Sequence, residues 1–122
     1  GNLEYHLLEN DLLSEKTEII TTNNKTFGLN YKLFENDALI FKHPSSQLLT
    51  IIEKEKPLLK VRYNGFPYLG IWTKTDAPFI CIEPWFGHSD LVDSNGNLID
   101  KAGIQTLESN ATFECAFSIE IL

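Results

Sequence analysis

One carboxylate stands in an unusual setting in the segment FPYLGIWTKTDAPFICIEPW, residues 66–85. Alternation with a period of two places Glu83 between Cys81 and Trp85 on one face of a strand. The next residue, Pro84, donates no backbone hydrogen bond. Half-burying a carboxylate in such surroundings is costly unless it has partners. The residues on its face are Phe79, Cys81, Glu83 and Trp85, and those on the opposite face are Ile80 and Ile82.

Two interpretations of Glu83 follow from this setting. In the first, an apolar strand face raises the pKa of its carboxyl group and makes it a general base. In the second, it forms a cross-strand ion pair with Lys60, Arg62 or Lys74 and has no catalytic part. Trp85 also has a structural and a functional interpretation. A tryptophan on a strand is a core residue by default, but it can also stack on a pyranose.

The segment around Glu83 predicts a pair of strands joined by the turn Thr75-Asp76-Ala77-Pro78. Asn64-Gly65 is a strong turn signal, and it predicts that strands 58–63 and 68–74 are neighbours. Gly70 lies inside the second of these strands. A glycine there indicates the close approach of a backbone or a ligand to the sheet.

The rest of the chain predicts short strands separated by turns, with one helical turn at most, around Leu33 and Phe34. We therefore expect a single all-β domain over residues 1–122, an antiparallel β-sandwich. The expected strands are 3–8, 16–22, 37–42, 48–54, 58–63, 68–74, 79–85 and 112–121, with a loop over 27–36 and a hairpin tip at 55–57.

The last expected strand has the cleanest alternation in the chain. Five of its apolar residues point one way, which is typical of an antiparallel sheet with one solvated face. Cys115 belongs to this set, and we expect both Cys81 and Cys115 to be reduced core thiols rather than a disulfide. The apolar residues of the strand are Phe113, Cys115, Phe117, Ile119 and Ile121.

Composition narrows the possible partners. The chain has 122 residues with 10 basic and 17 acidic side chains, so its net charge is -7. This balance argues against nucleic acid and anionic membrane, which both require positive charge facing phosphate. No apolar run is long enough to span a bilayer, and we expect a cytoplasmic protein without a cofactor. The run Asp93-Ser94-Asn95-Gly96-Asn97 lacks the spacing of a calcium loop, so no metal is predicted.

Several motifs together resemble the aldose 1-epimerase (galactose mutarotase-like) family, and most closely its LacX-like branch. They are FPYLGIWTK and APFICIEPW around Glu83, Gly87 and Asp90 just after it, LFENDALIF at 33–41 and KAGIQTL at 101–107. The resemblance implies a supersandwich fold, of which this chain is the C-terminal portion. It also implies that the longer protein binds a free aldose and interconverts its α and β anomers.

The resemblance implies roles for particular residues. Glu83 takes the place of the base and Asp37 the place of a side chain that holds a sugar hydroxyl, whereas without the family Asp37 reads as a turn or capping residue. Trp85 and Trp72 are the candidate sugar-stacking residues. The family's acid is a histidine from an earlier part of the fold, and its motifs do not match any of the three histidines here, which are His6, His43 and His88.

Two further expectations follow. A carbohydrate-binding β-sandwich without catalysis is the alternative function, because the acid histidine is missing from these residues. Part of a larger sandwich also leaves strand edges and an apolar sheet face uncovered, and uncovered edges favour pairing with another chain. We therefore expect self-association, as a homodimer formed through exposed sheet edges.

Overall fold

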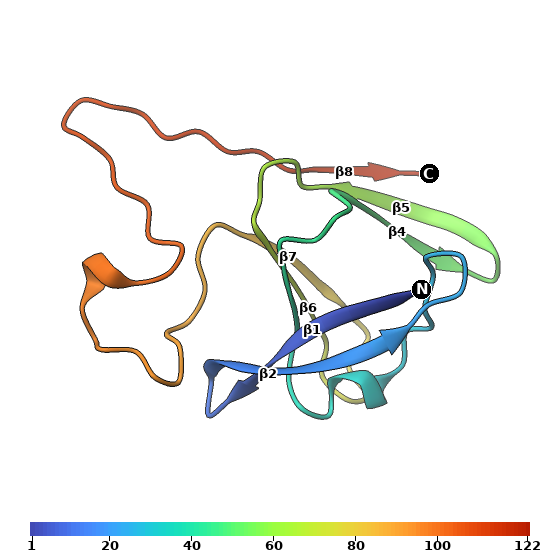
Figure 1. The fold of residues 1–122 in the computed structure, drawn as a ribbon. Helices are drawn as coiled ribbons and strands as arrows, with labels where there is room; N and C mark the ends of the chain where they lie inside the picture. Colours follow the sequence, from blue (N-terminus) through green and yellow to red (C-terminus); the bar gives the residue numbers. More distant parts are fainter.

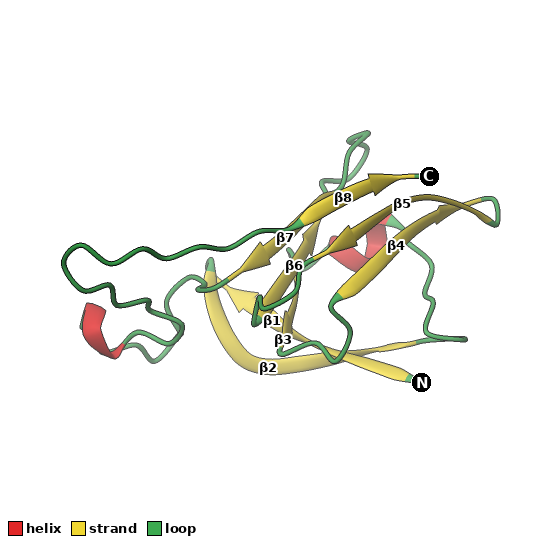
Figure 2. Ribbon diagram, turned by 90° about the horizontal axis from the view of Figure 1, so that it is seen from above, coloured by secondary structure: helices red, strands yellow, loops and turns green.

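The computed structural model describes residues 1–122, and its regular secondary structure is almost entirely antiparallel strands, which form two sheets (Figures 1 and 2). The five-stranded sheet has the order β2-β1-β3-β6-β7, and the three-stranded sheet has the order β4-β5-β8. Neither of the two short 3-10 helices is long and apolar enough to cross a membrane. The elements are β1 (Asn2–Glu9), β2 (Leu12–Thr21), η1 (Tyr31–Phe34), β3 (Leu39–Lys42), β4 (Leu48–Glu53), β5 (Lys56–Arg62), β6 (Tyr68–Trp72), β7 (Cys81–Trp85), η2 (Leu98–Asp100) and β8 (Ser118–Ile121).

Tight two-residue turns close the two hairpins that begin each sheet. Asn10 and Asp11 join β1 to β2 with φ of 49° and 67°, and Lys54 and Glu55 join β4 to β5 with φ of 48° and 66°. Positive φ at both central residues matches the right-handed twist of the flanking strands. The second hairpin tip therefore comes slightly earlier than expected, and Pro57 lies within β5.

The main core lies between the two sheets. Alternate side chains of the five-stranded sheet face β4 and β5, and η1 contributes the buried Phe34. Ile80 and Ile82 pack against this cluster, so the face predicted to lie opposite Glu83 is indeed the core face. The buried members of the core are Tyr5, Ile20, Phe34, Leu39, Phe41, Val61, Tyr63, Phe66, Leu69 and Ile71.

The turn at Asn64-Gly65 does not form the expected hairpin. Gly65 has the positive φ of 83° that such a turn requires, but β5 pairs with β4 and β8, whereas β6 pairs with β3 and β7. The prediction that 58–63 and 68–74 are neighbouring strands is wrong. Phe66, just after the turn, is buried in the main core, so the chain crosses from one sheet to the other at this point.

The predicted last strand forms only in part. Residues Ser118–Ile121 pair with β5, but residues 112–117 make no backbone hydrogen bond and run outside the sheets (Figure 1). Every residue from 111 to 122 is exposed, which contradicts the expectation of a core face here. Cys115 is a free thiol, as expected, but it is exposed rather than buried, and Cys81 is half-buried.

Candidate active site face

The five-stranded sheet has a second face, turned away from the main core, and Glu83 lies on it. Residues directly opposite each other on neighbouring strands share a face. A single row therefore crosses the whole sheet on this side, which we call the site face. The row runs through Thr17, His6, Ile40, Gly70 and Glu83.

Glu83 is half-buried on β7, the edge strand of the sheet. The indole Nε1 of Trp85 donates a hydrogen bond to its Oε2 at 3.2 Å. No Lys, Arg or His nitrogen lies within 4.0 Å of the carboxylate. The cross-strand ion pair considered above is therefore absent. Lys60 and Arg62 belong to the other sheet, where Arg62 lies 3.7 Å from Glu120.

Both tryptophans lie on the site face, next to a small second apolar cluster. The buried residues of this cluster are Leu13, Ala38 and Ile40. Trp72 and Trp85 pack against them and are themselves half-buried. An apolar floor with two indole rings beside a carboxylate can present both a stacking surface and a proton acceptor to a sugar ring.

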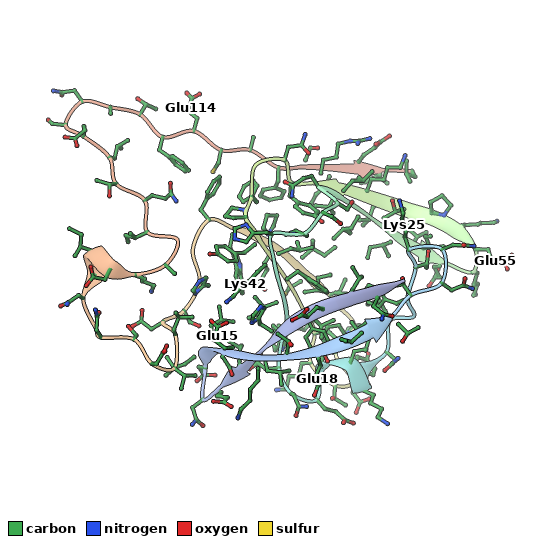
Figure 3. All side chains as sticks on the ribbon, viewed as in Figure 1. Glu15, Glu18, Lys25, Lys42, Glu55 and Glu114 are labelled. Atoms are coloured by element: carbon green, nitrogen blue, oxygen red, sulfur yellow. The ribbon has the colours of Figure 1, made fainter.

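A histidine, a tyrosine and an ion pair lie further along the same face. The ring of His88 meets that of Tyr68 edge-on, with centroids 4.8 Å apart. Tyr68 is opposite Lys42 in the β3–β6 pair, and Lys42 Nζ lies 3.1 Å from Glu15 Oε1 (Figure 3). This hydrogen bond and charge, with smaller contributions from the charges of His6 and His88, lower the pKa of Glu15.

The hydrogen-bond partners of His6 and His88 determine which ring nitrogen of each carries the proton. His6 Nδ1 is 3.0 Å from the carbonyl oxygen of Ser14, and His88 Nδ1 is 2.6 Å from that of Ser89. A carbonyl oxygen only accepts, so each Nδ1 carries the proton and donates. The Nε2 atom of each ring is then the one that can exchange a proton with a ligand when the imidazole is neutral.

Asp37 lies apart from Glu83. It precedes β3 with a positive φ of 78°, and its Oδ1 accepts a hydrogen bond from the backbone N–H of Ala38 at 2.7 Å. This is the geometry of a turn residue, although its carboxylate also borders an open hollow of about 510 Å³ that Glu83 does not line. The hollow is lined by Leu7, Leu8, Glu9, Asn10, Asp11, Lys16, Glu35, Asn36 and Asp37.

The segment that follows β7 crosses the site face and reaches β2. Leu13 N–H donates to Asp90 O at 2.9 Å, and Val92 N–H donates to Leu13 O at 3.0 Å. His88 consequently borders a second hollow, of about 210 Å³, together with Asp90 and Lys101, whose charged groups are 3.0 Å apart. His88 is thus half-buried and placed on the same face of the sheet as Glu83.

The sequence of this chain is similar to those of two bacterial proteins. The chain is 30% identical over 112 residues to the plasmid-encoded and the chromosomal LacX proteins of Lactococcus lactis subsp. lactis, and the match covers 90% of this chain and 37% of each relative. The chain thus spans little more than a third of the length of these relatives. No family model matches.

The fold also matches a solved structure. All of this chain superimposes, with a TM-score of 0.87 and 24% identity, on 42% of a galactose mutarotase related enzyme from Lactobacillus acidophilus. Together these matches support an aldose 1-epimerase-like family for this chain. The galactose mutarotase-like fold is confirmed, and this chain covers part of the length of the proteins that it matches.

Sequence reasoning located Glu83 and Trp85 on one face, as the structure shows, because period-2 alternation is a local signal. The β6–β7 pairing adds Trp72 to this face. It missed Lys42 and set aside His88. No spacing in the sequence relates these two residues to Tyr68, since their proximity depends on the β3–β6 pairing and on the course of the segment after β7.

Proposed function

We propose that this chain is the C-terminal portion of a longer, cytoplasmic aldose 1-epimerase-like protein that binds a free aldose and interconverts its α and β anomers. The observation that carries the proposal is Glu83, a half-buried carboxylate without a cationic partner, beside two tryptophans on an open sheet face. The LacX match and the galactose mutarotase-like fold support it.

In the proposed reaction Glu83 is the base. Its carboxylate takes the proton of the anomeric hydroxyl while an acid protonates the ring oxygen, so the bond between C1 and the ring oxygen breaks and an aldehyde forms. Rotation of the aldehyde and return of both protons close the ring as the other anomer. Each positioned acid or base contributes roughly 100- to 10,000-fold to the rate. The acid histidine comes from family sequence outside residues 1–122.

The substrate-binding residues of the proposal are Trp85, Trp72 and Asp37. The indole rings would stack on the apolar face of a pyranose, and Asp37 would accept from a hydroxyl group. Because Asp37 borders a hollow that Glu83 does not line, the proposal requires a ligand or a further segment of the protein that reaches from one to the other.

Polarimetry of a freshly dissolved α-aldose tests the proposal on the family-length protein. We expect Glu83→Gln to reduce anomer exchange by about 100-fold or more, because the amide cannot accept the proton. Glu114→Gln is the matched control, since Glu114 is exposed on the C-terminal arm, which comprises residues 111–122, far from the site face (Figure 3). An exchange rate that is the same in both variants would remove Glu83 from the mechanism.

A non-catalytic carbohydrate-binding β-sandwich is the second candidate, favoured by the two tryptophans on one face. Under this alternative, an aldose changes the tryptophan fluorescence of the wild-type protein while anomer exchange stays at the rate of the solvent reaction. Trp72→Phe and Trp85→Phe would then each weaken the fluorescence response, and Glu83→Gln would not alter the exchange rate.

Self-association as a homodimer is a further part of the proposal. Residues 112–117 are extended and have no backbone partner, and Phe113 and Phe117 are about half exposed. An unpaired strand of this kind is a template for pairing with another chain. Light scattering over a range of concentrations tests it, and a monodisperse monomer at high concentration would contradict it.

A further inference from the structure

Gly70 lies directly beneath the ring of Trp85. A Cβ atom built at Gly70 would be 2.7 Å from Trp85 Cζ2, 3.0 Å from Cη2 and 3.3 Å from Cε2. Real side chains do not approach a Cβ atom within 3.0 Å, so any other residue here would displace the ring. The close approach that a glycine within this strand predicts is therefore made by an aromatic side chain, not by a backbone or a ligand.

The indole of Trp85 is held on two further sides. It packs against the cluster of Leu13, Ala38 and Ile40, and its Nε1 donates to Glu83 Oε2 at 3.2 Å. Glu83 and Gly70 are directly opposite each other in the β6–β7 pair. The ring thus lies across β6, and its N–H group reaches back to the carboxylate on its own strand.

The hydrogen bond occupies only one carboxylate oxygen. Oε2 accepts from Trp85, whereas Oε1 has no hydrogen-bond partner in the protein. A carboxylate held by one oxygen keeps its orientation on the strand, and its second oxygen keeps its lone pairs for a ligand.

We propose that Gly70 is a positioning residue for the base. By leaving room for the indole over β6, it lets Trp85 hold Glu83 with Oε1 directed to the reacting hydroxyl. This inference rests on the proposed function for its catalytic consequence. The Trp85 N–H only donates a hydrogen bond, and the proton of the anomeric hydroxyl moves to Oε1 and returns to the substrate when the ring closes.

Indole N–H resonances of the chain test the geometry without any assay of activity. The chain has two tryptophans, and Trp85→Phe identifies which signal belongs to Trp85. We expect Glu83→Ala to move this signal and to speed exchange of its proton with solvent by about 10-fold, the effect of losing a hydrogen bond to a charged acceptor. The Trp72 signal is the internal control. An unmoved Trp85 signal would overturn the proposal.

Gly70→Ala should displace the Trp85 signal in the same direction. Gly28→Ala is the matched control, because a Cβ atom there meets nothing within 4 Å and its φ is not positive. If Gly70→Ala unfolds the chain, the double variant Gly70→Ala/Trp85→Phe provides a second test, since the smaller ring lacks the atoms that clash. A double variant no more stable than Gly70→Ala would contradict the proposal.

Kinetics of the family-length protein complete the test. Gly70→Ala and Trp85→Phe should both lower kcat for anomer exchange by about 10-fold or more, because a base misplaced by about 1 Å loses rate. Gly28→Ala should not change kcat. If the wild-type protein does not exchange anomers, the proposed function fails while the resonance test still decides the geometry. Unchanged kcat in Gly70→Ala would overturn the positioning role.

Discussion

The β6–β7 hairpin and the C-terminal arm, residues 111–122, are both rich in apolar side chains, yet they differ sharply in burial. Every residue of β6 except Trp72 is buried, and β7 is half-buried throughout. Every residue of the arm is exposed, including Phe113, Phe117 and Ile121. The chain leaves both sheets after β7, and the arm runs back towards them and ends as β8 beside β5 (Figure 2).

An apolar strand face does not by itself ensure burial. A strand with one apolar face can pack on a sheet, but it does so only where a partner strand supplies hydrogen bonds and an opposing apolar surface. β6 has β3 on one side and β7 on the other. Residues 112–117 have no partner strand on either side. Their apolar side chains could pack on a sheet, but they are exposed in this chain.

Hydrogen exchange should show the largest contrast between the two regions. We expect backbone amides of β6 to exchange about 1,000-fold more slowly than those of residues 112–117, since core strands open only with much of the molecule. Mass spectrometry of peptic fragments measures both. Equal rates would contradict the comparison. Protection of residues 112–117 that grows with protein concentration would instead support the homodimer proposed above.

Truncating one phenylalanine in the core and one on the arm should change stability by different amounts. Phe41, on the core face of β3, is 6% exposed, and Phe117 on the arm is 53% exposed. Phe41→Ala should lower the free energy of unfolding by about 3–5 kcal/mol, because it leaves a cavity. Phe117→Ala should cost about 1 kcal/mol or less, since it loses only an edge contact with Phe66. Urea unfolding of both variants measures the difference, and similar costs would refute it.

The smallest effect concerns pH. Burial and a 2.6 Å hydrogen bond to Glu18 raise the pKa of Tyr5, on β1, to about 12. The folded protein favours the neutral phenol of Tyr5. Its contribution to stability is therefore complete below pH ~10, the pKa of an unfolded tyrosine. This contribution declines as the pH rises towards about 12. Tyr5→Phe should remove this part of the alkaline loss of stability, followed by urea unfolding at several pH values.

Tyr31→Phe is the control for this experiment, because Tyr31 is 41% exposed and bonds only the carbonyl oxygen of Ala77. Its alkaline loss of stability should match that of the wild type. If Tyr5→Phe shows the same loss as well, burial of the Tyr5 hydroxyl does not contribute to the pH dependence.

Much of the local structure was predictable from the sequence. The faces of β7 follow from alternation, which places Glu83 and Trp85 together and Ile82 on the core side. The β6–β7 hairpin follows from the turn at Thr75–Pro78, where Asp76 has a positive φ of 63°. These features depend on backbone preferences over a few neighbouring residues, and the chain carries those preferences wherever it folds.

The pairing of the strands could not be predicted from local patterns. Asn64-Gly65 turns the chain, but the pairing of β6 with β3 instead of β5 sends it to the other sheet. The same pairing brings Lys42 beside Tyr68, and the register of β6 with β7 leaves Gly70 under the ring of Trp85. Pairing depends on contacts between residues far apart in the chain, and the free energy of those contacts is not contained in any local pattern. For this reason the local pattern was enough to place Glu83 and Trp85 on one face of β7, whereas strand pairing brought Trp72 to that face and set what surrounds them.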